Sequence, residues 1–304
     1  MDLKQIESFV RVAELGSFTR AAEALGLPQP LLSRHVRQLE VELHQTFLLR
    51  NGRGVTLTEA GRVLLEHGRG ILHQVALARE ELGTVRGALA GRVSIGLPPS
   101  LSKLITVPLT REFQKRLPNA QLKLTEGFSV VMYEGLRSGQ LDMAVLFNTP
   151  HSPDLEMRTL HRGALVLVSS EASRLRHGVK LAKRVSLSAL GKLPLIVPSR
   201  PNAFRLLIET ELGGVGVKPQ IVMEVDGLNA ILDLVREGLG FAVLPPYTLG
   251  NVPTPHSFTL HALHSPQLMS ELVLVTSARR PATETHKEVR SLVVEVVVKA
   301  IEGY

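Results

Sequence analysis

Basic and polar side chains gather on one face of a helical pattern in the segment LPQPLLSRHVRQLE, residues 27–40. The apolar positions at helical spacing are Leu32, Val36 and Leu39. Ser33, Arg34 and Arg37 fall on the opposite side. Proline fits the first turn of such a helix, because the N–H that it lacks would be unpaired there. These residue types suit an anionic partner, and which partner depends on the elements around the segment.

Other chemical patterns in the chain are incomplete. Residues 100–103 read S-x-x-K, a serine acylation motif, but neither S-D-N nor K-T-G occurs anywhere in the sequence. The glycines at 213–216 lack the spacing of a dinucleotide fingerprint, and the 11 histidines include no H-E-x-x-H pair. We therefore predict no catalytic residue, no metal site and no cofactor, with a hydrolytic enzyme as a remote alternative.

Composition describes a folded chain of two or three domains. Of the 304 residues, 44% are hydrophobic and 21% charged. Cysteine is absent, the start MDLKQIESFV is unlike a secretory signal, and no apolar run approaches the roughly 20 residues of a spanning helix. We expect a soluble cytoplasmic protein.

The net charge of +7 is unevenly distributed. Residues 1–90 carry 11 Lys and Arg against 10 Asp and Glu, whereas residues 91–304 carry 24 against 18. If the first segment binds nucleic acid, local placement of arginines must do so, because its bulk charge is small.

Residues 1–57 have the pattern of a winged helix-turn-helix. Helices are expected over 3–14, from a cap at Thr19 to Gly26, and over 29–42. The segment FLLRNGRGVTLT, residues 47–58, predicts a hairpin whose tip carries Arg50 and Arg53.

Residues 58–89 predict one long amphipathic helix, part of a linker assigned to residues 58–90. Its apolar stripe consists of Val63, Leu64, Ile71, Val75, Leu82 and Val85. A helix of this length with an uncovered stripe usually packs against a copy of itself, so we expect a homodimer or homotetramer.

From residue 91 onward, strand-like and helix-like runs alternate, which indicates an α/β domain with a mainly parallel sheet. Strands are expected at 92–97, 121–126, 141–147, 164–170, 194–198, 220–225, 241–245 and 271–277, with helices near 101–117, 129–138, 202–211, 227–237 and after Pro281. We assign subdomain I to about 91–162 and 268–304, and subdomain II to about 163–267. A cleft between them is expected, and no helix is predicted within residues 246–276.

The chain resembles the LysR-type transcriptional regulators from end to end. The resemblance is densest in LKQIESFVRVAELGSFTRAAEALGLPQPLLSRHVRQLEVEL and FLLRNGRGVTLTEAGRVLL, within the first 66 residues. The effector half, with LPNAQLKLTEG and LRSGQLDMAVL, is most similar to the nitrogen-assimilation-control branch. The resemblance implies a winged helix-turn-helix, a dimerising linker helix and a periplasmic-binding-protein-like effector domain of two α/β subdomains.

In that reading the opening segment is the recognition helix of a sequence-specific regulator of double-stranded DNA. The expected DNA-binding residues are Gln29, Pro30, Ser33, Arg34, Arg37, Arg50 and Arg53. Pro28 and Leu31 depart from the family, which usually has Ser and Ala there, so a contact at residue 28 is in doubt. RNA polymerase is a further expected partner, and a membrane is not.

Ligands of parallel α/β sheets bind beyond the carboxyl ends of the strands. The candidate effector-binding residues there are Ser100, Ser102, Ser129, Phe147, Ser199, Arg200 and Asp226. Arg200 is the only obvious cation, and with the basic balance of residues 91–304 it predicts a small anionic effector. The serines could equally cap helices. A ligand-independent regulator of the same fold is the alternative.

Overall fold

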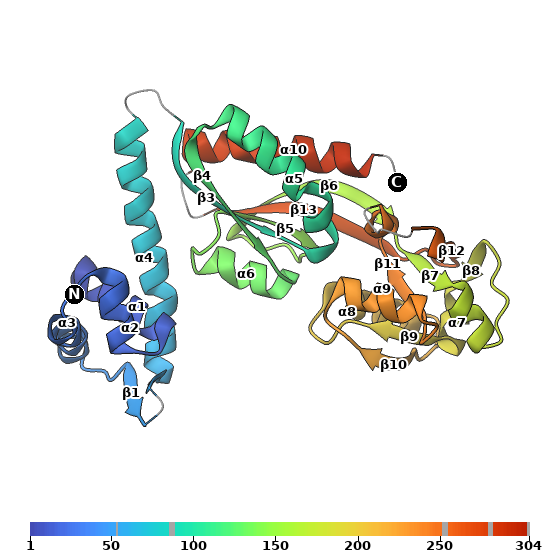
Figure 1. Ribbon diagram of the computed structural model, residues 1–304, viewed down its shortest axis with the longest axis horizontal. Coiled ribbons are helices and arrows are strands. Elements are labelled where there is room, and N and C mark those ends of the chain that lie inside the picture. The colour runs from blue at the N-terminus through green and yellow to red at the C-terminus, as the bar shows by residue number, and fades with distance from the viewer. Residues whose placement is uncertain (53, 85–88, 251–254, 279–281, 303–304) are drawn as a thin grey trace. The chain divides into compact units, whose positions relative to one another are not determined.

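The computed structural model describes residues 1–52, 54–84, 89–250, 255–278 and 282–302 (Figure 1). The chain divides into two compact units that separate near residue 88, with the short segment Arg137–Gln140 grouped with the first unit.

The first unit begins with three helices and a hairpin, as the sequence predicts. They are α1 (Leu3–Leu15), α2 (Phe18–Leu25), α3 (Gln29–Glu42), and the antiparallel strands β1 (Leu48–Asn51) and β2 (Gly54–Leu57). The expected Thr19 cap is wrong, because the side chain of Ser17 accepts the Arg20 N–H at the start of α2. The core contains the three predicted apolar positions of α3, and it is made of Ile6, Phe9, Val10, Val12, Phe18, Ala21, Ala22, Leu32, Val36, Leu39, Phe47 and Leu48.

Helix α4 (Glu59–Thr84) follows the hairpin, and residues 85–88 of the predicted helix 58–89, including Val85 of its stripe, lie outside the described residues. The Thr58 hydroxyl donates to the Thr46 carbonyl at 2.7 Å and accepts the Gly61 N–H at 3.0 Å, which fixes the start of the helix. A side chain at Gly61 would place its Cβ 2.2 Å from the Phe47 carbonyl oxygen, so the helix and the wing can approach only because this residue is glycine.

The second unit contains a five-stranded sheet in the order β4-β3-β5-β13-β6. Its strands are β3 (Ala90–Leu97), β4 (Asn119–Glu126), β5 (Met143–Phe147), β6 (Leu155–Ala164) and β13 (Met269–Ser277). Helices α5 (Pro99–Arg116) and α10 (Glu284–Ile301) cover one face, and α6 (Ser129–Arg137) covers the other (Figure 1). Alternate residues of β5 pack on the two faces, which explains why the whole strand is buried.

A second, four-stranded sheet has the order β11-β7-β12-β8. Its strands are β7 (Val166–Ser170), β8 (Arg184–Ser186), β11 (Ala242–Leu244) and β12 (Phe258–His264), and β9 (Pro194–Val197) pairs separately with β10 (Gln220–Glu224). The helical elements here are α7 (Glu171–Arg176), η1 (Leu187–Lys192), α8 (Ala203–Gly214), α9 (Leu228–Arg236), η2 (Pro246–Leu249) and η3 (Pro255–Ser257).

The expectation of a mainly parallel sheet is wrong. Strand β3 is parallel to β4 and β5, but β13 is antiparallel to both β5 and β6, and β7 is antiparallel to β11 and β12. The reversal arises because β13 returns from the second sheet to the first. Strand β12 is also parallel to β8, so both sheets are mixed.

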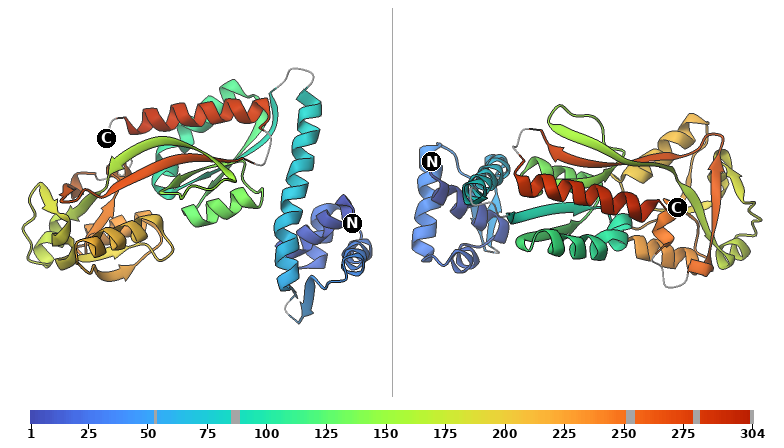
Figure 2. Two further views of the ribbon diagram at one scale, coloured as in Figure 1. Left: turned by 180° about the vertical axis from the view of Figure 1, so that it is seen from behind. Right: turned by 90° about the horizontal axis from the view of Figure 1, so that it is seen from above.

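Two adjacent strands connect the two sheets. Strands β6 and β13 pair along their length and run side by side from one sheet toward the other (Figure 2). At the point of crossing, the Leu165 N–H donates to the Leu268 carbonyl at 2.7 Å. The two subdomains of this unit are thus joined by two neighbouring segments. In the described part of the chain, no helix is both long and apolar enough to cross a membrane.

Candidate functional site

The outer face of α3 is the first candidate site. Gln29, Pro30, Arg34 and Arg37 are exposed, and Ser33 is half-buried. Among the residues that the structure describes, no acidic side chain forms an ion pair with Arg34 or Arg37. Both guanidinium groups can therefore turn to an external acceptor without first breaking an internal one.

Contacts from the other helices and the wing fix the position of α3. The ring Nδ1 of His35 lies 2.9 Å from the hydroxyl of Ser8 on α1. At the other end, the Glu40 carboxylate accepts the N–H groups of Phe47 and Leu48 at 2.8 and 3.2 Å, which ties the helix to the start of β1.

The start of α3 has no side-chain cap, because Pro28 occupies the N-cap position. The Pro28 carbonyl accepts the N–H groups of Leu31 and Leu32. Because Pro30 has no N–H, the Gln29 N–H is the first-turn donor that an external acceptor can still reach in the described part of the helix. In the wing, the backbone of Arg50 belongs to β1 but its side chain is not described, and Arg53 lies outside the described residues.

The second candidate site is a small cavity between the two subdomains of the second unit, here called cavity A. Its volume is about 40 Å³. The lining includes four of the seven predicted effector residues, Ser100, Ser129, Phe147 and Asp226. The other lining residues are Pro98, Pro99, Phe128, Pro198, Asn202, Ala203, Phe204, Leu228, Ile231 and Leu244.

The polar features of cavity A are hydroxyl groups, helix starts, the Asn202 amide and the Asp226 carboxylate. Helices α5 and α9 begin there without a side-chain cap, whereas the Asn202 side chain caps α8. The Ser129 hydroxyl accepts the Phe147 N–H at 3.2 Å, so its own proton remains available for donation. Burial raises the pKa of the Tyr247 phenol and the Ser100 hydroxyl opposes that shift, so the phenol stays protonated. The Tyr247 hydroxyl is buried and has no hydrogen-bond partner among the described residues.

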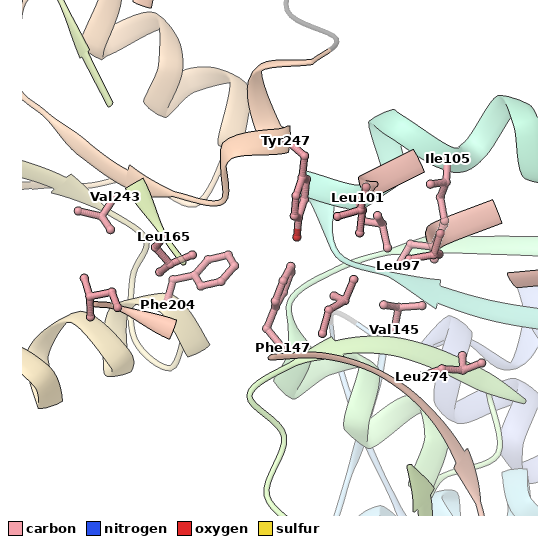
Figure 3. Packing of buried hydrophobic residues seen from close by; sticks show 14 of the residues in the cluster. Leu97, Leu101, Ile105, Val145, Phe147, Leu165, Phe204, Val243, Tyr247 and Leu274 are labelled. Atoms are coloured by element: carbon pink, nitrogen blue, oxygen red, sulfur yellow. The ribbon is translucent and has the colours of Figure 1, made fainter. Parts of the chain in front are cut away.

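Aromatic rings from both subdomains close cavity A. The ring centroids of Phe147 and Phe204 are 4.5 Å apart, and their planes are tilted by 53°. Figure 3 shows these two rings and Tyr247 pointing toward one another between the subdomains. Any ligand larger than the cavity has to separate them.

Three predicted effector residues do not line cavity A. The Ser102 hydroxyl lies 3.3 Å from that of Thr106 on the next turn of α5. The Ser199 N–H donates to the Asp226 carboxylate at 2.8 Å, so Ser199 acts on the cavity only through Asp226. Arg200 is largely exposed, and its guanidinium is paired with Glu209 at 2.7 Å.

Arg205 is a buried cation that the sequence analysis missed. Its guanidinium bonds to Glu209 at 2.6 Å, to Glu224 at 3.1 Å and to the Pro198 carbonyl at 3.3 Å. Burial alone would raise the pKa of Glu209, but hydrogen bonds from Arg205 and Arg200 lower it. The i,i+4 spacing of Arg205 and Glu209 is the sequence signal that could have found this pair. The network holds α8 to β10. It engages all three guanidinium nitrogens of Arg205, so Arg205 would have to break these contacts to bind a ligand.

A larger, half-open cavity lies beside cavity A and is here called cavity B. Its volume is about 410 Å³, and it shares Ser129, Phe147 and Ala203 with cavity A. The rest of its lining is Val130, Tyr133, Leu146, Asn148, Thr149, Pro150, Pro201, Leu206, Leu207 and Thr210. It lies where α6 of one subdomain faces α8 of the other.

Two family models match the chain. The model described as "Bacterial regulatory helix-turn-helix protein, lysR family" matches residues 3–62, and "LysR substrate binding domain" matches residues 86–297. The nitrogen assimilation regulatory protein nac of Escherichia coli (strain K12) is 30% identical over 98% of this chain and 95% of its own length. The HTH-type transcriptional regulator ShiR of Corynebacterium glutamicum (strain R) is 34% identical over 80% of this chain and 82% of its own.

Solved structures share the fold. A full-length OxyR variant from Pseudomonas aeruginosa matches with a TM-score of 0.73 at 21% identity, covering 98% of each chain. The regulator CbnR in complex with its target DNA matches with a TM-score of 0.68 at 22% identity, covering 99% of this chain and 100% of that one.

The chain therefore belongs to the LysR family of bacterial transcriptional regulators. It combines a DNA-binding winged helix-turn-helix with a two-subdomain effector-binding domain, as the sequence resemblance implies. The family is one of transcription regulators and not of enzymes.

Proposed function

We propose that this regulator binds operator DNA through α3 and the wing and responds to a small anionic effector in the cleft of the effector domain, with the acidic group of the effector in cavity A. The three functional parts would be residues 1–57 for DNA binding, 58–90 for dimerisation and 91–304 for effector binding. Within the last part, subdomain I would cover about 91–162 and 268–304, and subdomain II about 163–267. The protein would act in the cytoplasm, contact RNA polymerase as a further partner and catalyse no reaction.

The exposed arginines of α3, which have no ion-pair partner among the described residues, are the observation that carries the DNA-binding proposal. Arg34 and Arg37 would read bases or hold phosphates from the major groove, with Gln29, Pro30 and Ser33 beside them at the helix start. Arg50 and Arg53 stay predicted wing contacts. Recognition of an operator with two-fold symmetry requires two DNA-binding domains, one from each of two chains. Helix α4, with Val63 exposed on its surface, would pair two chains into a homodimer or into half of a homotetramer.

Hydroxyl groups and uncapped helix starts support an anionic effector. Ser100 and Ser129 can donate to a carboxylate, and the starts of α5 and α9 favour negative charge. In the described lining no Lys or Arg reaches cavity A, so these neutral donors would have to hold the anion. Arg200 stays a prediction, since it would have to leave Glu209 to bind the effector. The Asp226 carboxylate opposes an anion, and we place it at the rim, where it holds the Ser199 N–H.

A ligand-independent regulator is the second candidate. The small volume of cavity A and the contact between the Phe147 and Phe204 rings favour it, because both leave little room for a ligand in the cleft. In that case the cleft would serve only to hold the subdomains together.

Footprinting of the full-length protein on its own upstream DNA, with and without small acids, tests both candidates. The proposal predicts salt-sensitive protection of a spaced dyad that changes when an acid is added, and no change with the corresponding amide. Protection that no acid alters supports the ligand-independent regulator. Turnover of an added metabolite without any protection would support an enzyme and refute the regulator.

A further inference from the structure

Cavity A is too small to hold a whole effector. Its 40 Å³ are room for a few water molecules, or for a carboxylate group, but not for an organic acid of ordinary size. Cavity B has about 410 Å³, which is within the usual range for small-molecule sites. Because the two cavities share Ser129, Phe147 and Ala203, a molecule that enters one can extend into the other.

The lining of cavity B is chemically different from that of cavity A. In its described lining there is no Asp, Glu, Lys, Arg or His, and most side chains are aliphatic, aromatic or proline. The Asn148 amide oxygen accepts the Glu271 N–H at 2.8 Å, whereas the Asn148 amide nitrogen and the Thr149 hydroxyl are buried and have no hydrogen-bond partner among the described residues. A charged group would lose its hydration here and find no charged partner, only the neutral Asn148 amide nitrogen and Thr149 hydroxyl. An apolar group would gain free energy along the rest of the lining as its surface leaves water.

We propose that cavity B is the binding site for the apolar body of the effector, so that the ligand is an amphipathic acid. Its carboxylate would occupy cavity A, against the hydroxyl groups of Ser100 and Ser129 and the starts of α5 and α9. Its hydrocarbon part, aliphatic or aromatic, would pass Phe147 and lie between α6 and α8. The inference rests on the proposed function, to which it adds the chemical class of the ligand.

A series of acids that share a carboxylate and differ in chain length tests the proposal. Acetate, butyrate and hexanoate, with hexanamide as the neutral match, would be titrated into the full-length protein by ligand-observed NMR. In the variant Leu206→Trp a larger side chain fills cavity B; Leu206 is 47% exposed, so the fold should tolerate the exchange. Leu175→Trp is the matched control, because Leu175 lies on α7 in the same subdomain, is 75% exposed and lines neither cavity.

We expect the affinity of the wild type to rise about fourfold for each buried methylene, or about 15-fold from butyrate to hexanoate. Leu206→Trp should abolish this increase and leave acetate binding unchanged, while Leu175→Trp should bind all acids as the wild type does. Acids that bind equally well whatever their length, or a length dependence that survives Leu206→Trp, would overturn the proposal and leave the anionic effector standing.

The remaining outcomes separate the two proposals. If hexanamide binds as tightly as hexanoate, and both need an open cavity B, the apolar site is supported and the anionic effector is refuted. If no compound of the series binds to folded, DNA-binding protein, the amphipathic ligand and the anionic effector both fail.

Discussion

Replacement of Arg34 by alanine tests the DNA-binding face directly. Arg34 is exposed on α3, and in the described part of the chain it has no ion-pair partner, so its removal should change the free energy of unfolding by no more than about 0.5 kcal/mol. Any loss of operator binding can then be attributed to a missing DNA contact. The control is Arg11→Ala, since Arg11 lies on α1, is similarly exposed and pairs with Glu14 at 3.7 Å.

The size of the loss depends on what Arg34 touches. A bidentate contact to guanine is worth about 1–3 kcal/mol, which corresponds to about 5–150-fold in affinity for each half-site. A dimer on two half-sites would lose this free energy twice. If Arg34 holds only a phosphate, the loss should be the same on every sequence, and the slope of log K against log salt should fall by about 0.9 for each contact.

Fluorescence anisotropy on the footprinted operator and on a scrambled duplex, at several salt concentrations, distinguishes these cases. A larger loss on the operator than on the scrambled duplex indicates base reading, and equal losses indicate phosphate contact. Wild-type affinity and salt dependence in Arg34→Ala would refute the assignment of α3 as the DNA-contacting face at this position, and equal losses in Arg11→Ala would refute the reasoning from geometry.

Further expectations concern assembly, the cleft and the buried ion pairs. The double variant Val63→Glu, Val75→Glu on α4 should be monomeric in light scattering, and a variant that stays dimeric would place the interface elsewhere. Ile71 is left intact because it packs against the core of the DNA-binding domain. Ser100→Ala should weaken binding of the best acid more than Arg200→Ala does in calorimetry, since Arg200 is paired with Glu209; the reverse order would make Arg200 the anchor. Glu209→Gln should destabilise the effector domain by about 1.5–3 kcal/mol at pH 7. The pKa of Glu209 lies below its ordinary 4.5 in the folded state, so the ionised carboxylate stabilises the fold fully above pH 4.5. This stabilisation is lost as the pH falls through the folded pKa. The difference in the free energy of urea unfolding between wild type and Glu209→Gln should therefore shrink at lower pH and not grow.

The fold of the winged helix-turn-helix could be predicted from the sequence because its signals are local. The turn glycines, the Asn-Gly hairpin and the apolar positions of α3 each act over a few residues, and all three appear in the structure. Ser17 was missed as a cap because two neighbouring hydroxyl residues fit the pattern, and only the start of α2 at Phe18 distinguishes them.

The effector domain was harder to read because its features depend on distant segments. Strand β6 is partly exposed along its length and has no clean alternation, and the direction of β13 depends on the point at which the chain returns from the second sheet. Cavity B requires α6 and α8 to face each other, and Arg205 finds Glu224 on β10; neither pairing has a signature in either segment alone.

The double crossing at Leu165 and Leu268 makes subdomain II an insertion within subdomain I. Its two ends leave and re-enter the first sheet next to each other, because β6 and β13 are hydrogen-bonded neighbours there. A segment with adjacent ends can be exchanged for another without moving the termini of its host. Recombination at these two points could therefore graft one half of a ligand cleft onto an existing DNA-binding protein, so new inducer specificity could arise from a single cassette exchange while the operator stays the same.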